Sequence, residues 1–139
     1  MLVWFDAFIQ NVDRPPRNAN LLVWHRKLYP IDHGTALYFH HDWPTMEKKI
    51  ESPFPEIKDH VLLPWASEIG HAAKIAHERL TPDMLAGIVA LVPDEWFEAI
   101  PGDITPAGRR AGYMEFFTRR LESAAAFEKE AKSAHNRLV

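Results

Sequence analysis

Apolar residues recur at helical intervals over the first dozen positions of the chain. They are spaced three or four residues apart, and they are Leu2, Phe5, Ile9 and Val12. This spacing is typical of an amphipathic helix, which we expect over residues 2–11. Pro15 and Pro16 follow. Because proline cannot continue a helix, they predict a stiff, extended loop after the first helix.

Two short apolar runs after this loop predict a β-hairpin. The runs cover residues 21–24 and 28–31, and the polar segment 25–27 separates them, as expected for two strands and their turn. Pro30 lies in the second run. Proline has no N–H to donate to a neighbouring strand, so it belongs at a sheet edge. The hairpin would carry the chain from the loop at residues 13–18 to the segment at residues 32–34.

Beyond Pro44 the pattern becomes helical. We expect helical segments at residues 45–51, 56–62 (a turn or two), 67–80, 82–91, 93–99 and 107–136. Ser67 is the expected N-cap of the third of these segments, and Thr81 that of the fourth. Pro82 and Pro106 each stand near a helix start, where proline fits without loss of a hydrogen bond.

The last predicted helix combines an apolar stripe with arginine pairs. Arg109-Arg110 and Arg119-Arg120 alternate with Glu115 and Glu122. We expect these charges to form a solvated face, since mixed signs along a helix usually face water. The alternative is that the arginines meet an acidic partner.

These patterns predict a mainly α fold with one small β-hairpin. At 139 residues the chain fits one domain. Within it, residues 1–44 hold the loop and the hairpin, and residues 45–139 form a helical subdomain. Hydrophobic residues make up 47% of the chain and charged residues 25%, as in folded soluble domains.

Charge and cysteine content exclude several classes of function. The net charge of −3 gives no general nucleic-acid footprint. The absence of cysteine excludes disulfides and thiolate zinc sites. Asp6 interrupts the apolar run at the N-terminus, and no basic region precedes it, so we expect neither a signal peptide nor a membrane span. A cytoplasmic location is therefore expected.

The candidate chemistry lies in two polar motifs on either side of the hairpin. Asp13 and Asn18 are separated by four residues, and Asp32-His33-Gly34 follows fourteen residues after Asn18. This order and spacing are typical of a kinase catalytic loop and its metal-binding triplet. Phosphoryl transfer needs a carboxylate to accept the proton of the attacking hydroxyl, and oxygen ligands to hold Mg²⁺ against the phosphates. Asp13, Asn18 and Asp32 would fill these roles in turn.

The segment from Val3 to Pro44 resembles the HipA-like kinases, and especially the branch described simply as a HipA-like kinase domain. It is more distantly similar to the phosphatidylinositol 3- and 4-kinases, whose loops carry Asp-Arg-His and Ile-Asp-Phe-Gly. The residues that carry the resemblance are Trp4-Phe5-Asp6-Ala7, Asn11-Val12-Asp13-Arg14, Arg17-Asn18-Ala19-Asn20-Leu21-Leu22 and Ile31-Asp32-His33-Gly34-Thr35-Ala36-Leu37-Tyr38-Phe39-His40-His41. Over the remaining residues the resemblance is limited to helical character.

The resemblance implies the C-terminal lobe of a protein-kinase-like fold, without the N-terminal lobe. It implies transfer of the γ-phosphoryl group of ATP, with Mg²⁺, to a hydroxyl of unknown origin. Asp13 would be the catalytic base, and Asn18 and Asp32 the metal ligands. The expected cofactor-binding residues are Arg14, Arg17 and Asn20, the two arginines as available cations and the asparagine as a neighbour that holds the loop.

The chain departs from the family pattern at three positions. Val12 stands where ordinary protein kinases have an arginine before the catalytic aspartate. Pro15 stands where relatives have a lysine or histidine, and His33 replaces the usual phenylalanine. These departures leave the contact with the substrate phosphate open.

Other interpretations of the same residues remain. Each motif alone is also compatible with an ordinary loop or turn. Only twelve residues precede Asp13, which leaves no room for the lobe that carries the glycine-rich loop and its lysine. The chain could therefore be a weak or inactive phosphotransferase lobe, a fragment of a longer kinase, or a non-catalytic module. Such a module would dock a separate N-lobe or a second copy of itself.

Two further expectations concern apolar and histidine residues. A lone lobe would expose a cleft lined by Leu28, Tyr29, Leu37, Tyr38 and Phe39. His40 and His41 offer metal-ligand types, but neighbouring residues on a strand point to opposite faces, so we do not expect them to share one ion.

Overall fold

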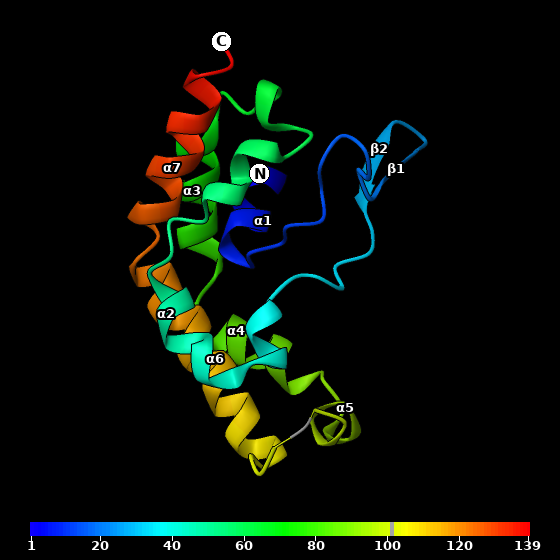
Figure 1. The fold of residues 1–139 in the computed structure, drawn as a ribbon, viewed down its shortest axis with the longest axis vertical. Coiled ribbons are helices and arrows are strands. Elements are labelled where there is room, and N and C mark those ends of the chain that lie inside the picture. Colours follow the sequence, from blue (N-terminus) through cyan, green and yellow to red (C-terminus); the bar gives the residue numbers. More distant parts are fainter. Residues whose placement is uncertain (101) are drawn as a thin grey trace.

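The computed structural model describes residues 1–100 and 102–139, and this part of the chain is mainly helical with a small antiparallel sheet (Figure 1). The α-helices are α1 (Leu2–Phe8), α2 (Met46–Ile50), α3 (Ile69–Arg79), α4 (Pro82–Ala90), α5 (Asp94–Glu98), α6 (Pro106–Glu122) and α7 (Ala125–Asn136). The strands are β1 (Leu21–Trp24) and β2 (Lys27–Pro30), and short 3-10 helices are η1 (Tyr38–His41), η2 (Trp43–Thr45), η3 (Pro55–Asp59) and η4 (Leu63–Trp65).

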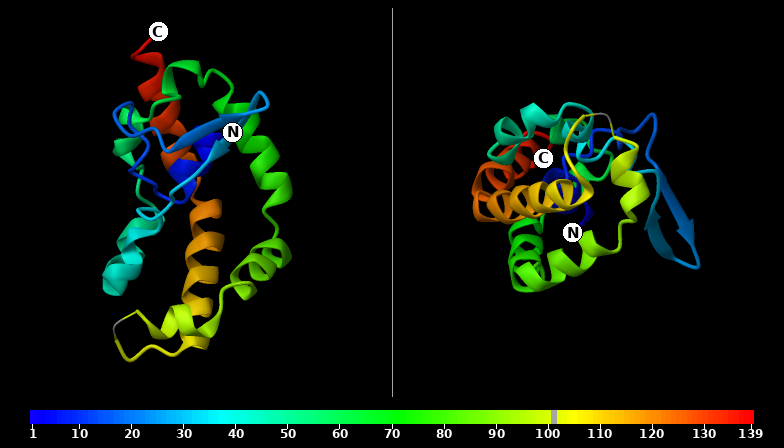
Figure 2. Two further views of the ribbon diagram at one scale, coloured as in Figure 1. Left: turned by 90° about the vertical axis from the view of Figure 1, so that its right-hand side faces the viewer. Right: turned by 90° about the horizontal axis from the view of Figure 1, so that it is seen from below.

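The helices form two connected groups. At one end α1 packs against α3 and α7, and their buried side chains make up the larger core. At the other end α6 contacts α2, α4 and α5, with a smaller core of Phe39, Ile50 and Phe116. The hairpin of β1 and β2 projects from one side of the molecule (Figures 1 and 2).

Helix α1 is shorter than predicted, and its buried face differs from the expected one. It ends at Phe8, and Gln10 adopts a positive φ of 55°, which turns the chain out of the helix. Its buried residues are Val3, Trp4, Asp6, Ala7 and Phe8. The spacing predicts Phe5 and Val12 on the apolar face, but both are exposed. The helix packs against both α3 and α7. Packing therefore buries a broader face of the helix than the spacing of the apolar residues in the sequence predicts.

The predicted helix over residues 107–136 is two helices in the structure. α6 ends at Glu122 and α7 begins at Ala125. The expected solvated arginine face is also wrong for two of its members, because Arg109 and Arg120 are fully buried. The other two are partly exposed and bind acidic residues: Arg110 pairs with Asp94, and Arg119 pairs with Glu47.

Arg120 explains why the chain folds this way around the junction. Its guanidinium donates to five backbone carbonyls, those of Ala7, Phe8, Lys49, Ile50 and Ser52, at 2.7–3.1 Å. Four of these carbonyls belong to the last turns of α1 and α2, where helical carbonyls lack intrahelical partners. Burial lowers the pKa of Arg120 to about 10, so it is still a cation at neutral pH.

The helix caps follow the prediction in part. The Thr81 hydroxyl accepts a hydrogen bond from the Met84 N–H, and the Thr105 hydroxyl accepts one from the Gly108 N–H. Both threonines precede a proline that starts the helix. Ser67 is not a cap, because α3 begins two residues later, after Glu68.

The hairpin has a tighter turn than predicted. Trp24 pairs directly with Lys27, so His25 and Arg26 alone connect the strands. Both adopt positive φ, 46° and 60°, as a two-residue type I′ turn requires. Pro30 pairs with Leu21 at the open end of the hairpin, at the position expected for a proline at a sheet edge.

Within the described residues, the helices are all too short or too polar to cross a lipid bilayer.

Candidate active site

The loop between α1 and β1 holds the Asp13 carboxylate between two asparagines. The Asn18 side-chain amide donates to one carboxylate oxygen at 2.9 Å, and the Asn20 amide donates to the other at 3.0 Å. The Asn20 amide also donates to the Asp13 backbone carbonyl at 2.9 Å. On the other side, the Asp13 N–H donates to the Asn11 side chain at 3.2 Å. Asp13 is therefore fixed in position while remaining half exposed.

Asn20 has a backbone conformation that asparagine tolerates well. Its φ is 46°, and in this left-handed region asparagine is several-fold enriched over most other residues. The turn at Asn20 directs its side chain back onto Asp13 and sends the chain into β1. A short polar residue is needed at this position for both reasons.

A buried ion pair lies beneath the loop. Arg14 Nε donates to the Asp6 carboxylate at 2.5 Å, and neither side chain is exposed. His60 Nε2 lies 2.9 Å from the same Asp6 oxygen, and the Asn11 amide donates to the other at 3.2 Å. Burial by itself would raise the pKa of Asp6, but the hydrogen bonds from His60 and Arg14 and the charge of Arg14 together lower it.

Arg14 also ties the loop to both ends of the hairpin. Its guanidinium donates to the carbonyl of Asn20 at 2.6 Å and lies 3.2 Å from His33 Nε2. An arginine can only donate, so this nitrogen of His33 is the acceptor. His33 directly follows Asp32, and the contact therefore connects the two sequence motifs on opposite sides of the hairpin.

Two further hydrogen bonds bring the motifs together. The Thr35 hydroxyl donates to Asn11 at 2.9 Å, and the Ile31 N–H donates to the Asn20 carbonyl at 2.9 Å. Together with the contact between Arg14 and His33, they place the segment at residues 31–35 against the loop at residues 11–20. Phosphoryl transfer requires such a juxtaposition.

Asp32 lies on this segment and is exposed. Its φ is 49°, and its carboxylate accepts a hydrogen bond from the Gly34 N–H at 3.3 Å. Among the described residues, no hydrogen bond or ion pair joins Asp32 to Asp13 or Asn18. In the same part of the chain, no group of three or more histidine, aspartate or glutamate side chains is close enough to hold a metal. Asn18 is exposed as well, with its amide nitrogen bound to Asp13.

The two arginines of the loop lie in different environments. Arg14 is buried, and its nitrogens contact Asp6, Asn20 and His33. Arg17 is exposed to solvent. Of the two expected cofactor-binding cations, Arg17 is accessible to a ligand in this conformation, and Arg14 holds the loop.

The residues expected to line an uncovered cleft separate into three environments. Phe39 is buried against Phe116 in the smaller core. Leu37 borders an apolar cavity beside α4–α6. Leu28, Tyr29 and Tyr38 are exposed, with the first two on β2.

Sequence reasoning missed Asp6, His60 and Asn11 as parts of the site. A signal for Asp6 was present, because a single carboxylate inside an apolar helical run must be either exposed or paired. His60 could not have been found from local sequence, since it lies 54 positions away and reaches Asp6 only through the packing of the chain after η3.

The loop and the hairpin thus hold the Asp13 carboxylate in a fixed position. The same unit exposes the side-chain oxygens of Asn18 and Asp32, which are possible metal ligands, and the cation of Arg17. Comparison with known proteins gave no match to any family model, any curated protein or any solved structure. A function for this chain is therefore inferred from the arrangement of these residues.

Proposed function

We propose that this chain is the C-terminal lobe of an ATP- and Mg²⁺-dependent phosphotransferase of the HipA-like kinase type. The observation that carries the proposal is the position of Asp13, whose two carboxylate oxygens bind Asn18 and Asn20. A catalytic base must be held where it can take the proton of the attacking hydroxyl. The sequence motifs select these same three residues.

Each residue then has a chemical role. Asp13 accepts the proton of the substrate hydroxyl, and Asn18 and Asn20 orient its carboxylate. Asn18 and Asp32 offer oxygen ligands of the kind that Mg²⁺ prefers, and the bound ion would neutralise charge on the phosphates. Arg17 is exposed and is the cation for a phosphate oxygen.

Arg14 has a positioning role in this proposal. Its contacts with Asp6, the Asn20 carbonyl and His33 hold the catalytic loop against the segment that carries Asp32. The departure at His33 fits this role, because a phenylalanine at that position could not accept a hydrogen bond from the guanidinium.

Activity by these residues alone should be low. In a two-lobed kinase the nucleotide lies between the lobes, and the phosphate-binding lysine comes from the other one. Loss of transition-state contacts worth about 4 kcal/mol slows a reaction roughly a thousandfold. We therefore expect weak binding of Mg-ATP and negligible turnover until a second lobe is supplied.

Calorimetric titration with ATP, with and without Mg²⁺, tests the proposal. We expect weak, Mg²⁺-dependent binding that falls at least tenfold in Asp32→Asn. The matched control is Asp59→Asn, since Asp59 is exposed and pairs with its neighbour Lys58. Absence of Mg²⁺-dependent binding to the parent, or equal binding by the two variants, contradicts the proposal. Radiolabelled ATP with Asp13→Ala as the blank measures turnover, and robust phosphorylation above that blank would show that no second lobe is needed.

A second candidate function is a non-catalytic interaction module. It is favoured by the apolar side chains that the hairpin exposes on both of its faces, Val23 at 73% and Trp24 at 66% among them. The two functions respond to different changes. For a phosphotransferase lobe, Asp32→Asn weakens Mg²⁺-dependent ATP binding and leaves association intact. For a docking module, Trp24→Glu weakens association and Asp32→Asn has no effect.

A further inference from the structure

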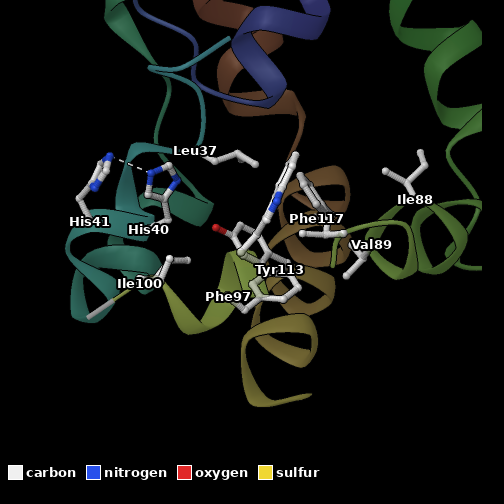
Figure 3. A pocket seen from close by; sticks show the side chains of 12 residues that line it. Leu37, His40, His41, Ile88, Val89, Phe97, Ile100, Tyr113 and Phe117 are labelled. Carbon is white, nitrogen blue, oxygen red and sulfur yellow. Dashed lines mark hydrogen bonds between the residues drawn. The ribbon is translucent and has the colours of Figure 1, made fainter. Parts of the chain in front are cut away.

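An apolar cavity of about 460 Å³ lies beside helices α4, α5 and α6 (Figure 3). It is bordered by η1 and by helices α4, α5 and α6, with Leu37 on the segment that leads into η1. Its volume lies in the range of small-molecule sites, which are mostly apolar with a few polar groups. None of the candidate active-site residues lines it.

The inner wall of the cavity is built from packed, mainly aromatic side chains. Phe97 and Phe117 lie on either side of Tyr113, at ring distances of 5.9 and 6.3 Å. Val89 completes this wall from α4 and is buried. These ring contacts join α5 and α6 and shape the inner wall of the cavity.

The outer side of the cavity is open and apolar. Trp96 is 68% exposed and Ile88 is 50% exposed, and both line the cavity. A tryptophan gains stability from burial of its large ring. A ligand that occupies the cavity would cover these two side chains and remove that apolar surface from water.

One end of the cavity is polar. His40 and His41 lie on η1, and their Nε2 atoms are 2.8 Å apart. The expectation that they point to opposite faces is wrong, because the chain forms a 3-10 turn at this position and not a strand. In Figure 3 His40 lies between His41 and the rest of the lining.

This end of the cavity is suited to a hydrogen-bond acceptor. Burial lowers the pKa of His40, which favours the neutral imidazole, and when its Nε2 accepts from His41 its Nδ1 carries an N–H that can donate. Among the residues that the structure describes, the lining includes no aspartate, glutamate, lysine or arginine, so no described carboxylate competes for this end. Tyr113 adds a neutral hydroxyl donor, because burial raises its pKa to about 12.

We propose that the cavity binds a small apolar carboxylic acid. Its hydrocarbon part lies against Phe97, Phe117 and Val89 and is covered by Trp96, and its carboxylate accepts hydrogen bonds from His40 and Tyr113. Hydrogen-bond complementarity selects this ligand class, since the polar groups of the lining are an imidazole N–H and a phenol O–H, and an ionised carboxylate accepts stronger hydrogen bonds than a neutral group does.

Decanoate and decanol are a matched pair of probes, since they share the hydrocarbon chain and differ in the head group. Binding is measured by titration calorimetry below the micelle concentration, with the quenching or shift of tryptophan fluorescence as a second readout. We expect decanoate to bind the parent protein at least tenfold more tightly than decanol.

Two variants test the place of binding. Val92→Phe fills the cavity and should abolish decanoate binding. Leu91→Phe is its control, because Leu91 is the preceding residue, is 80% exposed and does not line the cavity. Circular dichroism and thermal unfolding establish that both variants fold. Equal binding by the two variants overturns the proposal.

A third variant tests the head group. His40→Phe keeps a ring of similar shape and removes the nitrogen donors, so decanoate should lose at least tenfold in affinity while decanol is unchanged. An equal loss for both probes, no loss for either, or no binding of decanoate to the parent overturns the proposal. A failure here leaves the proposed phosphotransferase role untouched, because no variant alters the loop or the hairpin.

Discussion

The carboxylate of Asp6 and the guanidinium of Arg14 form an ion pair at 2.5 Å that is fully shielded from solvent. Asp6 comes from α1, and Arg14 comes from the loop that carries Asp13. The pair therefore anchors the candidate catalytic loop to the core, and further hydrogen bonds from His60 and Asn11 satisfy the same carboxylate. Removal of one member leaves the other buried and unpaired.

Asp6→Asn should destabilise the fold strongly. Breaking a buried ion pair by changing one partner costs about 3–5 kcal/mol, since an uncompensated charge stays buried. Urea unfolding at neutral pH measures the effect. Asp59→Asn changes the same side chain at an exposed site and should stay within about 0.5 kcal/mol of the parent. A similar small loss in both variants would mean that Arg14 finds another partner in the loop.

The contribution of Asp6 should also depend on pH. The pKa of Asp6 in the folded protein lies below the ordinary value of 3.8. Burial alone would raise this pKa, but the hydrogen bonds from His60 and Arg14 together outweigh it. The unfolded chain therefore takes up the proton first as the pH falls, and the stability given by the charged carboxylate is complete above the ordinary value and lost below it. The difference in unfolding free energy between the parent and Asp6→Asn should shrink from neutral pH to about pH 3. A difference that stays constant or grows over this range contradicts the assignment.

The sequence predicted the elements whose signals are local. The strand at residues 21–24 is found with the predicted bounds, and proline-preceding Thr81 and Thr105 mark the starts of α4 and α6. The proximity of Asp13 to Asn18 also follows from a short, stiff loop with two prolines. In each case the determining residues lie within a few positions of one another.

The features that sequence reasoning missed depend on distant contacts. The arginine pattern predicts Arg120 as a surface cation, and it is buried because the carbonyl ends of α1 and α2 converge on it from 70 to 113 positions away. His60 supports Asp6 in the same way. His40 and His41 were misplaced because a local pattern did not distinguish a 3-10 turn from a strand. Long-range polar contacts of this kind leave little trace in residue spacing.

Arg120→Met should be among the most damaging changes outside the candidate site. Methionine can fill the space but cannot donate to the five carbonyls that Arg120 binds. The Lys49 carbonyl keeps the Gln10 amide as a donor, and each buried carbonyl that is left without a donor costs about 1–3 kcal/mol. We expect a loss of about 4 kcal/mol or more. Arg120→Lys should recover only part of it, because an ammonium has three donors and a different geometry.

Thermal and urea unfolding measure the Arg120 effect, and Arg137→Met is the control. Arg137 is exposed near the C-terminus and contacts Ser133 and Glu130 on α7. Its replacement should change stability by less than about 1 kcal/mol. Near-equal losses at the two positions would mean that water or another donor satisfies the carbonyls.

Asp32→Asn should weaken the binding of a divalent cation without unfolding the chain. Asp32 is exposed, and its turn with Gly34 can be kept by asparagine, whose side-chain oxygen also accepts the Gly34 N–H. Two protein ligands leave most of the coordination shell to water, so we expect weak binding of Mg²⁺ or Mn²⁺. The measurement is the enhancement of water-proton relaxation by bound Mn²⁺. Relative to the parent, this enhancement should fall in Asp32→Asn and in Asn18→Ala, but not in Asp42→Asn. Equal enhancement in all of these variants would assign Asp32 a purely structural role.

The hairpin of β1 and β2 should mediate association. Leu22, Trp24 and Tyr29 lie on one face, and Val23 and Leu28 lie on the other, all exposed. A lone two-stranded hairpin is only marginally stable in water, and exposed apolar surface of this kind usually marks an interface. Helix α7 does not cover it, since that helix packs on α1, α3, η3 and η4. We therefore expect a self-associated species or a complex with an N-lobe partner that buries about 1,600 Å².

Trp24→Glu and Arg26→Gln separate apolar contact from charge at this hairpin. Each lowers the net charge by one, but only the first removes apolar surface, because Arg26 lies in the turn. Sedimentation equilibrium of the parent should show concentration-dependent association. Trp24→Glu should lower the association constant at least tenfold, and Arg26→Gln should leave it within about threefold. The two variants then differ by at least about 0.7 kcal/mol in association free energy. A parent that stays monomeric at high concentration would exclude self-association and assign the hairpin to a different chain. Equal weakening by both variants would mean that charge, and not the exposed tryptophan, holds the copies together.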